Sequence, residues 1–253
     1  DMISEMESVM KVFEKYDIQV FRPEVIDNYN QIFSRDIGFV IEDKFISANI
    51  LPERDQEITA IHHVLNQIPK ENRISLPEEC HVEGGDVMPW NDYIFIGTYS
   101  GKEYSEYITA RTNMNAVKAI QELFPNKIVK SFELRKSNDN AKENALHLDC
   151  CFQPIGKNMA ILHKNGFLIE EEFKWLVNYF GNENVFEISK DEMYQMNSNV
   201  FSISEDVVIS EQNFTRLNLW LEAKGFTVEK VPYQEIAKQE GLLRCSTLPL
   251  VRD

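Results

Sequence analysis

The chain has 253 residues, of which 43% are apolar and 11% aromatic, enough to bury a full-sized core without disulfides or structural metals. Acidic residues number 41 against 26 basic ones, which gives a net charge of -15, and no run of lysine and arginine offers phosphates a binding surface. The composition therefore argues against nucleic acid as a partner and favours small cations over anions.

A helical pattern of apolar residues opens the chain, at residues 2–13, and four segments of similar pattern follow it. Each segment predicts a β-hairpin with a short turn. Each hairpin is followed by a helix, whose apolar residues recur about every 3.6 positions, and by one further strand. The hairpins occupy about 33–46, 82–96, 146–162 and 197–209, the helices 55–68, 112–124, 169–180 and 213–224, and the later strands 73–76, 128–132, 185–188 and 227–231.

The repeated unit is therefore ββαβ, and its four copies carry a short polar residue at matching places: Asp36, Asp86, Asp149 and Asn199. A helix and strand over residues 2–22 and a strand over residues 243–251 remain. They predict a fifth unit split across the termini, which lacks one strand that we expect upstream. Five such units predict an α/β fold, a five-bladed pseudo-symmetric propeller closed on itself, as one domain over residues 1–253. An open α/β sheet is the alternative.

Residues that open the first strand of each unit would converge near the axis of such a ring. They include Arg35, Asp36, Glu83, Asp86, His147, Asp149, Asn197 to Asn199, Arg244 and Cys245. A guanidinium group suits this set, because it is a planar cation with five N–H donors that pairs with carboxylates. Its carbon is a poor electrophile and needs a nucleophile as strong as a cysteine thiolate. One histidine can protonate the departing nitrogen and then activate water.

Four motifs resemble the ordered signatures of the guanidino-modifying pentein enzymes, a family that includes arginine deiminase, dimethylarginine dimethylaminohydrolase and glycine amidinotransferase. The motifs are Phe33–Asp36, Glu83–Asp86, His147–Asp149 and Leu243–Thr247, and Ala110–Asn113 resembles an arginine-bearing segment of the deiminases. The resemblance spans residues 30–252 and implies the pentein fold, which is the same five-bladed propeller.

Carried over position by position, the resemblance implies three catalytic residues. Cys245 is the implied nucleophile, and His147 is the implied acid and base. Glu83 is implied to orient His147 and to stabilise its charge.

The resemblance also implies four residues for binding the substrate. Asp36 and Asp149 are implied to hold the guanidinium nitrogens. Arg111 is a candidate for pairing with a substrate carboxylate, with capping of the following helix as the alternative. Asp86 belongs to this group, with bracing of the Gly84–Gly85 turn as its expected role. An ion pair between Arg35 and Asp36 is the structural alternative for that motif.

Attack by Cys245 would leave a covalent thiouronium intermediate. Hydrolysis of this intermediate by water gives a ureido product, as in a deiminase or dimethylargininase, whereas attack by an amine makes the enzyme an amidinotransferase. We expect hydrolysis, because the chain shows no insertion that would form a second amine site. A non-catalytic binding protein of the same fold is a third alternative, against which the cysteine and histidine argue. We expect no cofactor and no metal.

The longest apolar runs, residues 37–41 and 93–96, fall far short of the roughly 20 residues of a membrane span, and no secretory signal opens the chain. The cysteines show neither a disulfide framework nor a zinc-ligand spacing: Cys80, Cys150, Cys151 and Cys245. We therefore expect a cytoplasmic protein without membrane partners, whose partner is a small guanidino compound. The sequence leaves the oligomeric state open, with a homodimer as one option.

Overall fold

The computed structural model describes residues 1–103 and 105–252, and it contains four three-stranded sheets of one design. In each sheet the first two strands form an antiparallel hairpin, and the third strand pairs in parallel with the second. The strands are β1 (Gly38–Ile41), β2 (Lys44–Ser47), β3 (Arg73–Ser75), β4 (Val87–Trp90), β5 (Tyr93–Thr98), β6 (Ile128–Glu133), β7 (Phe152–Ile155), β8 (Met159–Leu162), β9 (Val185–Glu187), β10 (Phe201–Ser202), β11 (Val207–Glu211) and β12 (Thr227–Val231). A parallel partner requires a crossover connection, which the helical segment of each unit supplies. The predicted ββαβ repeat is thus confirmed.

Three of the four predicted crossover helices are regular α-helices, each amphipathic with a buried apolar stripe. The helices are α1 (Met2–Lys15), α2 (His62–Leu65), α3 (Met114–Leu123), α4 (Glu170–Phe180), α5 (Lys190–Tyr194), α6 (Thr215–Ala223) and α7 (Gln234–Ala237). The first crossover differs, because a 3₁₀ helix, η1 (Pro52–Ile61), precedes the short α2. Its buried residues Glu57 and Ala60 lie three positions apart, which matches the three residues per turn of a 3₁₀ helix.

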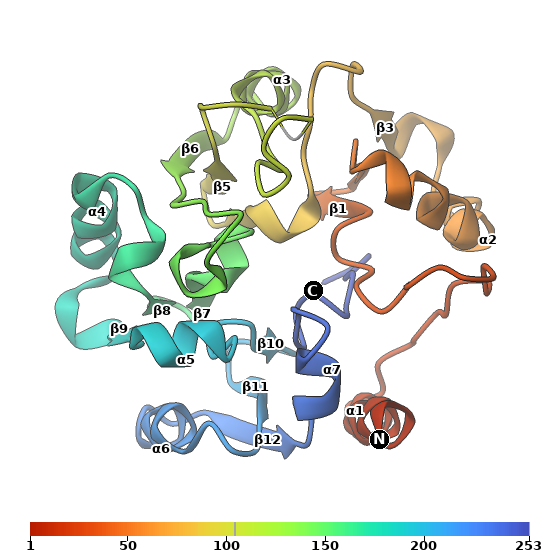
Figure 1. Ribbon diagram of the computed structural model, residues 1–253. Helices are drawn as coiled ribbons and strands as arrows, with labels where there is room; N and C mark the ends of the chain where they lie inside the picture. Colours follow the sequence, from red (N-terminus) through yellow and green to blue (C-terminus); the bar gives the residue numbers. More distant parts are fainter. Residues whose placement is uncertain (104, 253) are drawn as a thin grey trace.

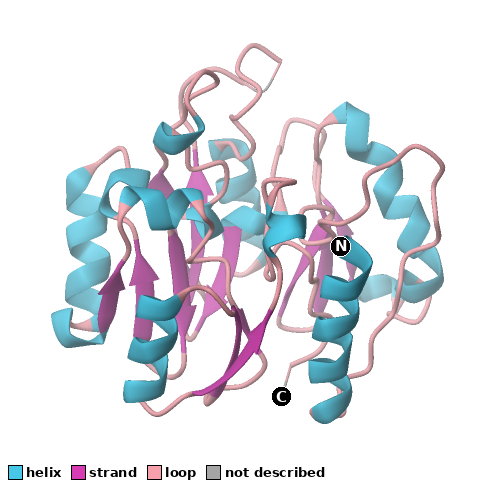
Figure 2. Ribbon diagram, turned by 60° about the horizontal axis from the view of Figure 1, so that its bottom comes forward, coloured by secondary structure: helices cyan, strands magenta, loops and turns pink. Residues whose placement is uncertain are grey.

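The four sheets surround a common centre, with the helices on the outside (Figure 1). Helix α1 occupies the sector between the last unit and the first, where it packs against α7 and β12. The same arrangement, strands inside and helices outside, is visible when the molecule is turned (Figure 2). The centre is therefore surrounded by the first strands of several units.

The strands that we expected within residues 2–22 and 243–251 are absent from the described part of the chain. Residues around Cys245 form turns instead, in which Ser246 N donates to Leu242 O (3.1 Å) and Thr247 N donates to Arg244 O (3.1 Å). These local hydrogen bonds occupy backbone N–H and C=O groups that a strand would pair with a neighbouring strand. The four sheets consequently remain separate, and the described residues form no closed sheet.

Aromatic packing joins neighbouring units where no strand pairing does. The ring of Phe152 on β7 lies 5.6 Å from that of Phe95 on β5 and 6.4 Å from that of Phe132 on β6, measured between centroids. All three side chains are fully buried, and tilted or edge-on pairs of this kind are favourable. No helix among the described residues has the length and apolar character to cross a bilayer.

Candidate active site

Hydrogen bonds tie the openings of neighbouring units to one another around the centre. Each joins one motif region to the next: Gly84 N to Asp36 O (3.4 Å), Leu148 N to Asp86 Oδ1 (2.8 Å), Ser198 Oγ to Asp149 O (2.8 Å), Arg244 N to Asn199 O (3.2 Å) and Arg35 N to Cys245 O (2.9 Å). Segments far apart in the sequence are thereby held in fixed positions beside one another.

A cavity of about 130 Å³ lies among these segments. Its lining is made of Phe33, Asp36, Arg54, Arg111, Leu146, His147, Cys150, Gln239, Glu240 and Cys245. The predicted nucleophile and the predicted acid and base therefore face one enclosed space. A larger depression of about 340 Å³, between residues 51–53 and 105–108, contains none of the predicted catalytic residues, so the smaller cavity is the candidate site.

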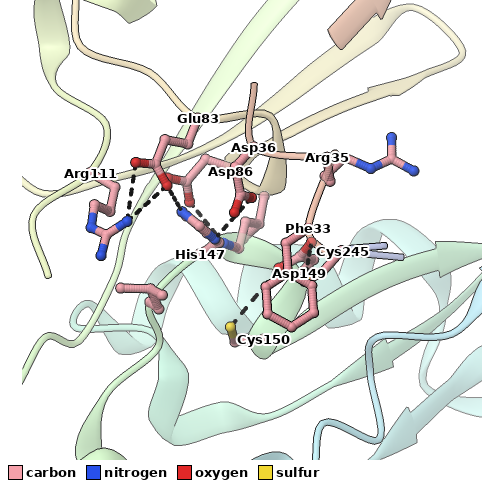
Figure 3. A network of polar contacts seen from close by, with 12 residues as sticks. Phe33, Arg35, Asp36, Glu83, Asp86, Arg111, His147, Asp149, Cys150 and Cys245 are labelled. Atoms are coloured by element: carbon pink, nitrogen blue, oxygen red, sulfur yellow. Dashed lines mark hydrogen bonds and ion pairs between the residues drawn. The ribbon is translucent and has the colours of Figure 1, made fainter. Parts of the chain in front are cut away.

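A line of three charged side chains borders the cavity (Figure 3). Arg111 Nη1 donates to both oxygens of Glu83 (3.1 and 3.0 Å), and His147 Nε2 lies 2.6 Å from Glu83 Oε2. Burial alone lowers the pKa of His147, but the charge of Asp36 and the hydrogen bond with Glu83 outweigh it and raise that pKa to about 9. Burial also disfavours the charged form of Glu83, yet His147 and Arg111 lower the pKa of Glu83 to about 2. His147 is therefore an imidazolium and Glu83 a carboxylate at neutral pH.

The glycine at position 85 lets the imidazole lie where it does. A Cβ atom on Gly85 would come within 2.7 Å of His147 Nδ1 and within 2.8 Å of its Cγ. Because real Cβ atoms do not approach other atoms this closely, any larger residue would displace the ring. The Glu83–Asp86 motif thus supplies both a carboxylate partner for His147 and the space that the ring fills.

Asp36 lines the cavity, and its two carboxylate oxygens differ in their hydrogen bonding. Its Oδ2 accepts a hydrogen bond from Arg54 Nη1 (2.7 Å). Its Oδ1 is buried, lies 3.7 Å from His147 Nδ1, and has no hydrogen-bond partner among the described residues. Burial raises the pKa of Asp36, against the opposing charges of His147 and Arg54. A buried carboxylate oxygen without a donor is costly, so the cavity is suited to a ligand that brings an N–H group.

Arg54 lines the cavity, although no motif in the sequence indicated it. Its Nε and Nη2 donate to the two oxygens of Glu57 (2.7 and 2.9 Å), while Nη1 reaches Asp36. Arg54 and Glu57 are three residues apart on η1, so they lie on the same side of a 3₁₀ helix. The polar run of residues 53–57 within a predicted crossover helix was the one signal that could have indicated it.

The Cys245 sulfur is buried in the wall of the cavity. It accepts a hydrogen bond from Asn199 Nδ2 (3.1 Å), and its thiol lies 3.8 Å from Asp149 Oδ2. Burial first, and then the charges of Asp149 and Asp36, raise the pKa of the Cys245 thiol well above its usual range. The thiol is therefore protonated in the unliganded cavity, and a cation placed beside it would favour the thiolate.

Cys150 is a second thiol in the same wall. Its sulfur lies 3.9 Å from Asp149 Oδ1, on the other oxygen of the carboxylate that Cys245 approaches. Burial raises the pKa of Cys150 to about 12. Cys150 and Cys151 both belong to the hydrophobic core, and Cys150 also lines the cavity.

Asp149 and Asp86 do not line the cavity. Asp149 is fully buried and accepts a hydrogen bond from Arg244 Nη1 (2.9 Å). Asp86 accepts from the Thr112 hydroxyl (2.6 Å) as well as from the next unit. Arg35 does not pair with Asp36, since its Nε donates to Arg244 O (3.2 Å). The carboxylates of Asp149 and Asp86 thus accept hydrogen bonds from groups of the protein itself.

Asp36, Glu83 and His147 are also the described residues whose ligand atoms, all within 4.8 Å of one another, could surround a metal ion. Arg54 binds the first carboxylate and Arg111 the second. The pKa of His147, about 9, means that a metal would have to displace its proton at neutral pH. As long as His147 keeps its proton, the site offers a thiol, an acid and a carboxylate around a small cation.

The chain is similar to known proteins in sequence and in fold. A family model for the eukaryotic N,N-dimethylarginine dimethylhydrolases matches residues 1–252. An uncharacterised protein of Bacillus subtilis, YkgA, is 27% identical over 248 residues, which are 96% of this chain and 78% of that protein.

Two solved structures share the fold at lower identity. The N-terminal domain of ArgZ, a cyanobacterial arginine dihydrolase, has been solved with a covalently bound reaction intermediate; its TM-score is 0.82 at 17% identity, over 99% of this chain and 86% of that one. DDAH from Pseudomonas aeruginosa, solved with citrulline, has a TM-score of 0.76 at 17% identity, over 98% of this chain and 89% of that one.

Proposed function

The chain belongs to the N,N-dimethylarginine dimethylhydrolase family and is a cysteine-dependent guanidino hydrolase; we propose that its substrate is an N-methylated arginine and that Cys245, His147 and Glu83 carry out the reaction. The pentein resemblance and the expectation of a hydrolase rather than an amidinotransferase are thereby confirmed. The choice of substrate and the role of each residue are our inference from the geometry of the cavity.

One observation carries the proposal: Asp36, whose buried Oδ1 has no hydrogen-bond partner among the described residues, lines the same cavity as Cys245 and His147. A guanidinium N–H group bound to this oxygen brings a positive charge between Asp36 and the sulfur. That charge offsets the groups that keep the thiol protonated. Substrate binding and formation of the thiolate are thus coupled.

The apolar part of the lining favours methylated substrates. Phe33 and Leu146 flank the cavity together with the Cys150 sulfur. Dimethylation of one guanidinium nitrogen removes its N–H donors and adds two methyl groups, so the group needs fewer acceptors and more apolar contact. A site with one open carboxylate oxygen and apolar walls meets both needs.

The reaction follows from these positions. Binding of the guanidinium releases the thiol proton to solvent, the thiolate attacks the guanidinium carbon, and His147 gives its proton to the departing dimethylamine, leaving a covalent thiouronium on Cys245. Water then attacks the same carbon and His147 takes one of its protons. The other proton passes to the sulfur as the carbon–sulfur bond breaks, which releases citrulline and restores the thiol. Glu83 holds the imidazole in place through both steps and stabilises its charge.

The far end of an amino-acid substrate can be bound by charges that line the cavity. The guanidinium of Arg111 donates from Nη1 to Glu83 and from Nε to Ile108 O, which leaves Nη2 to bind a substrate carboxylate. Arg54 adds a second positive charge, and Glu240 offers a carboxylate to an α-ammonium group. In this proposal Asp149 and Asp86 support the site from behind and do not touch the substrate.

We also propose that the architecture is five-fold and forms one catalytic domain. The inter-unit hydrogen bonds run from the first unit through the fourth to residues 244–245 and back to Arg35, which supports a fifth unit built from α1 and the C-terminal segment. In this proposed fifth unit, α1 and the turns around Cys245 occupy the positions that strands occupy in the other four units.

The test is to incubate the purified protein separately with asymmetric dimethylarginine, monomethylarginine, arginine and agmatine, and to measure the ureido product and the amine released. We expect citrulline and dimethylamine from dimethylarginine, and no turnover by Cys245→Ala. Ammonia from arginine without amine from the methylated compounds would identify a deiminase-type substrate instead. No ureido product from any of the four compounds would overturn the proposal.

A further inference from the structure

We infer that Asn199 is a positioning residue for the reaction, whose side-chain amide donates a hydrogen bond to the Cys245 sulfur and favours the thiolate that attacks the substrate. The inference rests on the proposed role of Cys245 as the nucleophile. Asn199 Nδ2 lies 3.1 Å from Cys245 Sγ, and Asn199 is fully buried.

The orientation of the amide is fixed by its other contact. Asn199 Oδ1 accepts a hydrogen bond from the backbone N–H of Cys245 (3.1 Å). Because a backbone N–H is only a donor, the oxygen of the amide must face it, and the NH₂ group must face the sulfur. The main chain adds a third contact, since Arg244 N donates to Asn199 O (3.2 Å). The donor is therefore held against the sulfur from two sides.

Comparison of the repeated units shows what the amide adds. The matching positions of the other three units carry aspartates, at residues 36, 86 and 149. Asp86 Oδ1 accepts from Leu148 N in the next unit (2.8 Å), just as Asn199 Oδ1 accepts from Cys245 N. A carboxylate can thus fill the accepting role, and the N–H donor is what asparagine supplies in addition.

The surroundings of the sulfur explain why a donor is needed there. Burial first, and then the neighbouring groups Asp149, Asp36 and Cys150, raise the pKa of the Cys245 thiol, against a backbone hydrogen bond with Leu242 that lowers it. Among the described residues, Asn199 is the one whose side chain donates a hydrogen bond to this sulfur. A hydrogen bond to the charged form of a group favours that form, whereas a carboxylate at position 199 would add another negative charge against it.

The test is the substitution Asn199→Asp, which keeps the size and the accepting oxygen and removes the donor. Alkylation of Cys245 by iodoacetamide is followed against pH through the mass of its tryptic peptide, residues 245–252, so no substrate is required. We expect the midpoint to rise by at least about one pH unit, which makes alkylation about tenfold slower at a fixed pH below the midpoint. In turnover, kcat should fall at least about tenfold with a smaller change in KM.

Asn184→Asp is the matched control, because Asn184 Nδ2 also donates a hydrogen bond, to Phe180 O (2.9 Å), outside the cavity. It should alkylate as the wild type does. If Asn199→Asp does not fold, as judged by thermal unfolding, Asn199→Ala removes the donor without adding a charge and should also alkylate more slowly. Wild-type alkylation of a folded variant at every pH would overturn the inference, even if turnover were lost. Failure of the wild type to hydrolyse methylated arginines would instead contradict the proposed function. The alkylation rates of the wild type and the variant would then still decide whether Asn199 favours the thiolate of Cys245.

Discussion

The Nε2 atom of His147 lies 2.6 Å from an oxygen of Glu83, and both side chains are almost completely buried. Arg111 binds the same carboxylate from its other side. Charge-assisted hydrogen bonds of this kind are strong where water is excluded. The contact therefore keeps His147 protonated, which is the state that can give a proton to a departing amine.

Substituting Glu83 by glutamine should lower the pKa of His147 from about 9 by at least about one unit, because the hydrogen bond and the negative charge that stabilise the imidazolium are lost. The measurement is an NMR titration of the imidazole. Turnover of a methylated arginine at a pH between the two midpoints should fall with the imidazolium fraction.

Glu103→Gln is the matched control for this change. Glu103 lies 2.8 Å from the Nδ1 atom of His81, in a more exposed pair that does not line the cavity. It should leave the His147 titration unchanged. An unaltered midpoint for His147 in folded Glu83→Gln would show that Glu83 does not tune the imidazole.

Folding stability should decrease as the pH rises from about 6.5 to about 9. The pKa of His147 is about 9 in the folded state against 6.5 for an ordinary histidine, so in this interval the folded state binds a proton that the unfolded state does not. The stabilisation is complete below pH 6.5 and is lost as the pH passes through about 9, on the order of 3 kcal/mol. Urea unfolding at several pH values measures the slope. His147→Asn should flatten it, and an equal slope in both proteins would contradict the assignment.

Replacing Gly85 by alanine should disable the site through His147 rather than through the backbone. The added methyl group would lie 2.7 Å from Nδ1, so the ring must move. A displacement of about 1 Å costs roughly 100-fold in rate. Gly225→Ala provides the comparison: its Cβ would meet no atom within 4 Å, but its φ of 93° makes alanine strained. That control should lose stability and keep its kcat.

Asp36 and Glu57 both bind Arg54, but Asp36 also has an oxygen without a hydrogen-bond partner among the described residues. Substitutions of the two carboxylates should therefore differ in their effect on turnover. Asp36→Asn removes the charge that we propose for guanidinium binding, and kcat/KM should fall about 100-fold or more. Glu57→Gln also weakens the Arg54 ion pairs but leaves Asp36 intact, and its loss should be under about tenfold. Equal losses in the two variants would mean that Asp36 acts only by holding Arg54.

The repeat was predictable because each ββαβ unit is encoded locally, by hairpin turns and by apolar periodicity. Asp36, Glu83 and His147 were predictable because they precede the first strands of their units, and Cys245 and Arg111 because their motifs resemble those of the pentein enzymes. Cys245, His147, Asp36 and Arg111 line one cavity, with Glu83 directly behind.

What the sequence did not indicate depends on contacts between segments that are apart in the chain. Residues 52–61 form a 3₁₀ helix where we expected an α-helix, and Arg54 on it donates a hydrogen bond to Asp36. Residues 243–251 read as a strand, yet the chain around Cys245 turns to bond to Leu242 and Asn199. The partners of Asp149 and Asp86 could not be read either, because a carboxylate that binds a substrate and one that binds Arg244 look alike in a sequence.

The two thiols of the cavity should differ in function although they lie beside opposite oxygens of Asp149. Only Cys245 receives a hydrogen bond from Asn199, whereas Cys150 lies beside the carboxylate and has no side-chain donor among the described residues. We therefore expect Cys150→Ala to retain turnover within about fivefold, since it removes one wall contact of a partly apolar cavity. Cys245→Ala should remove turnover altogether. Mass spectrometry of an acid-quenched reaction should find the added thiouronium on the peptide of residues 245–252 in the wild type and in Cys150→Ala. An adduct on the peptide containing Cys150 would reassign the nucleophile.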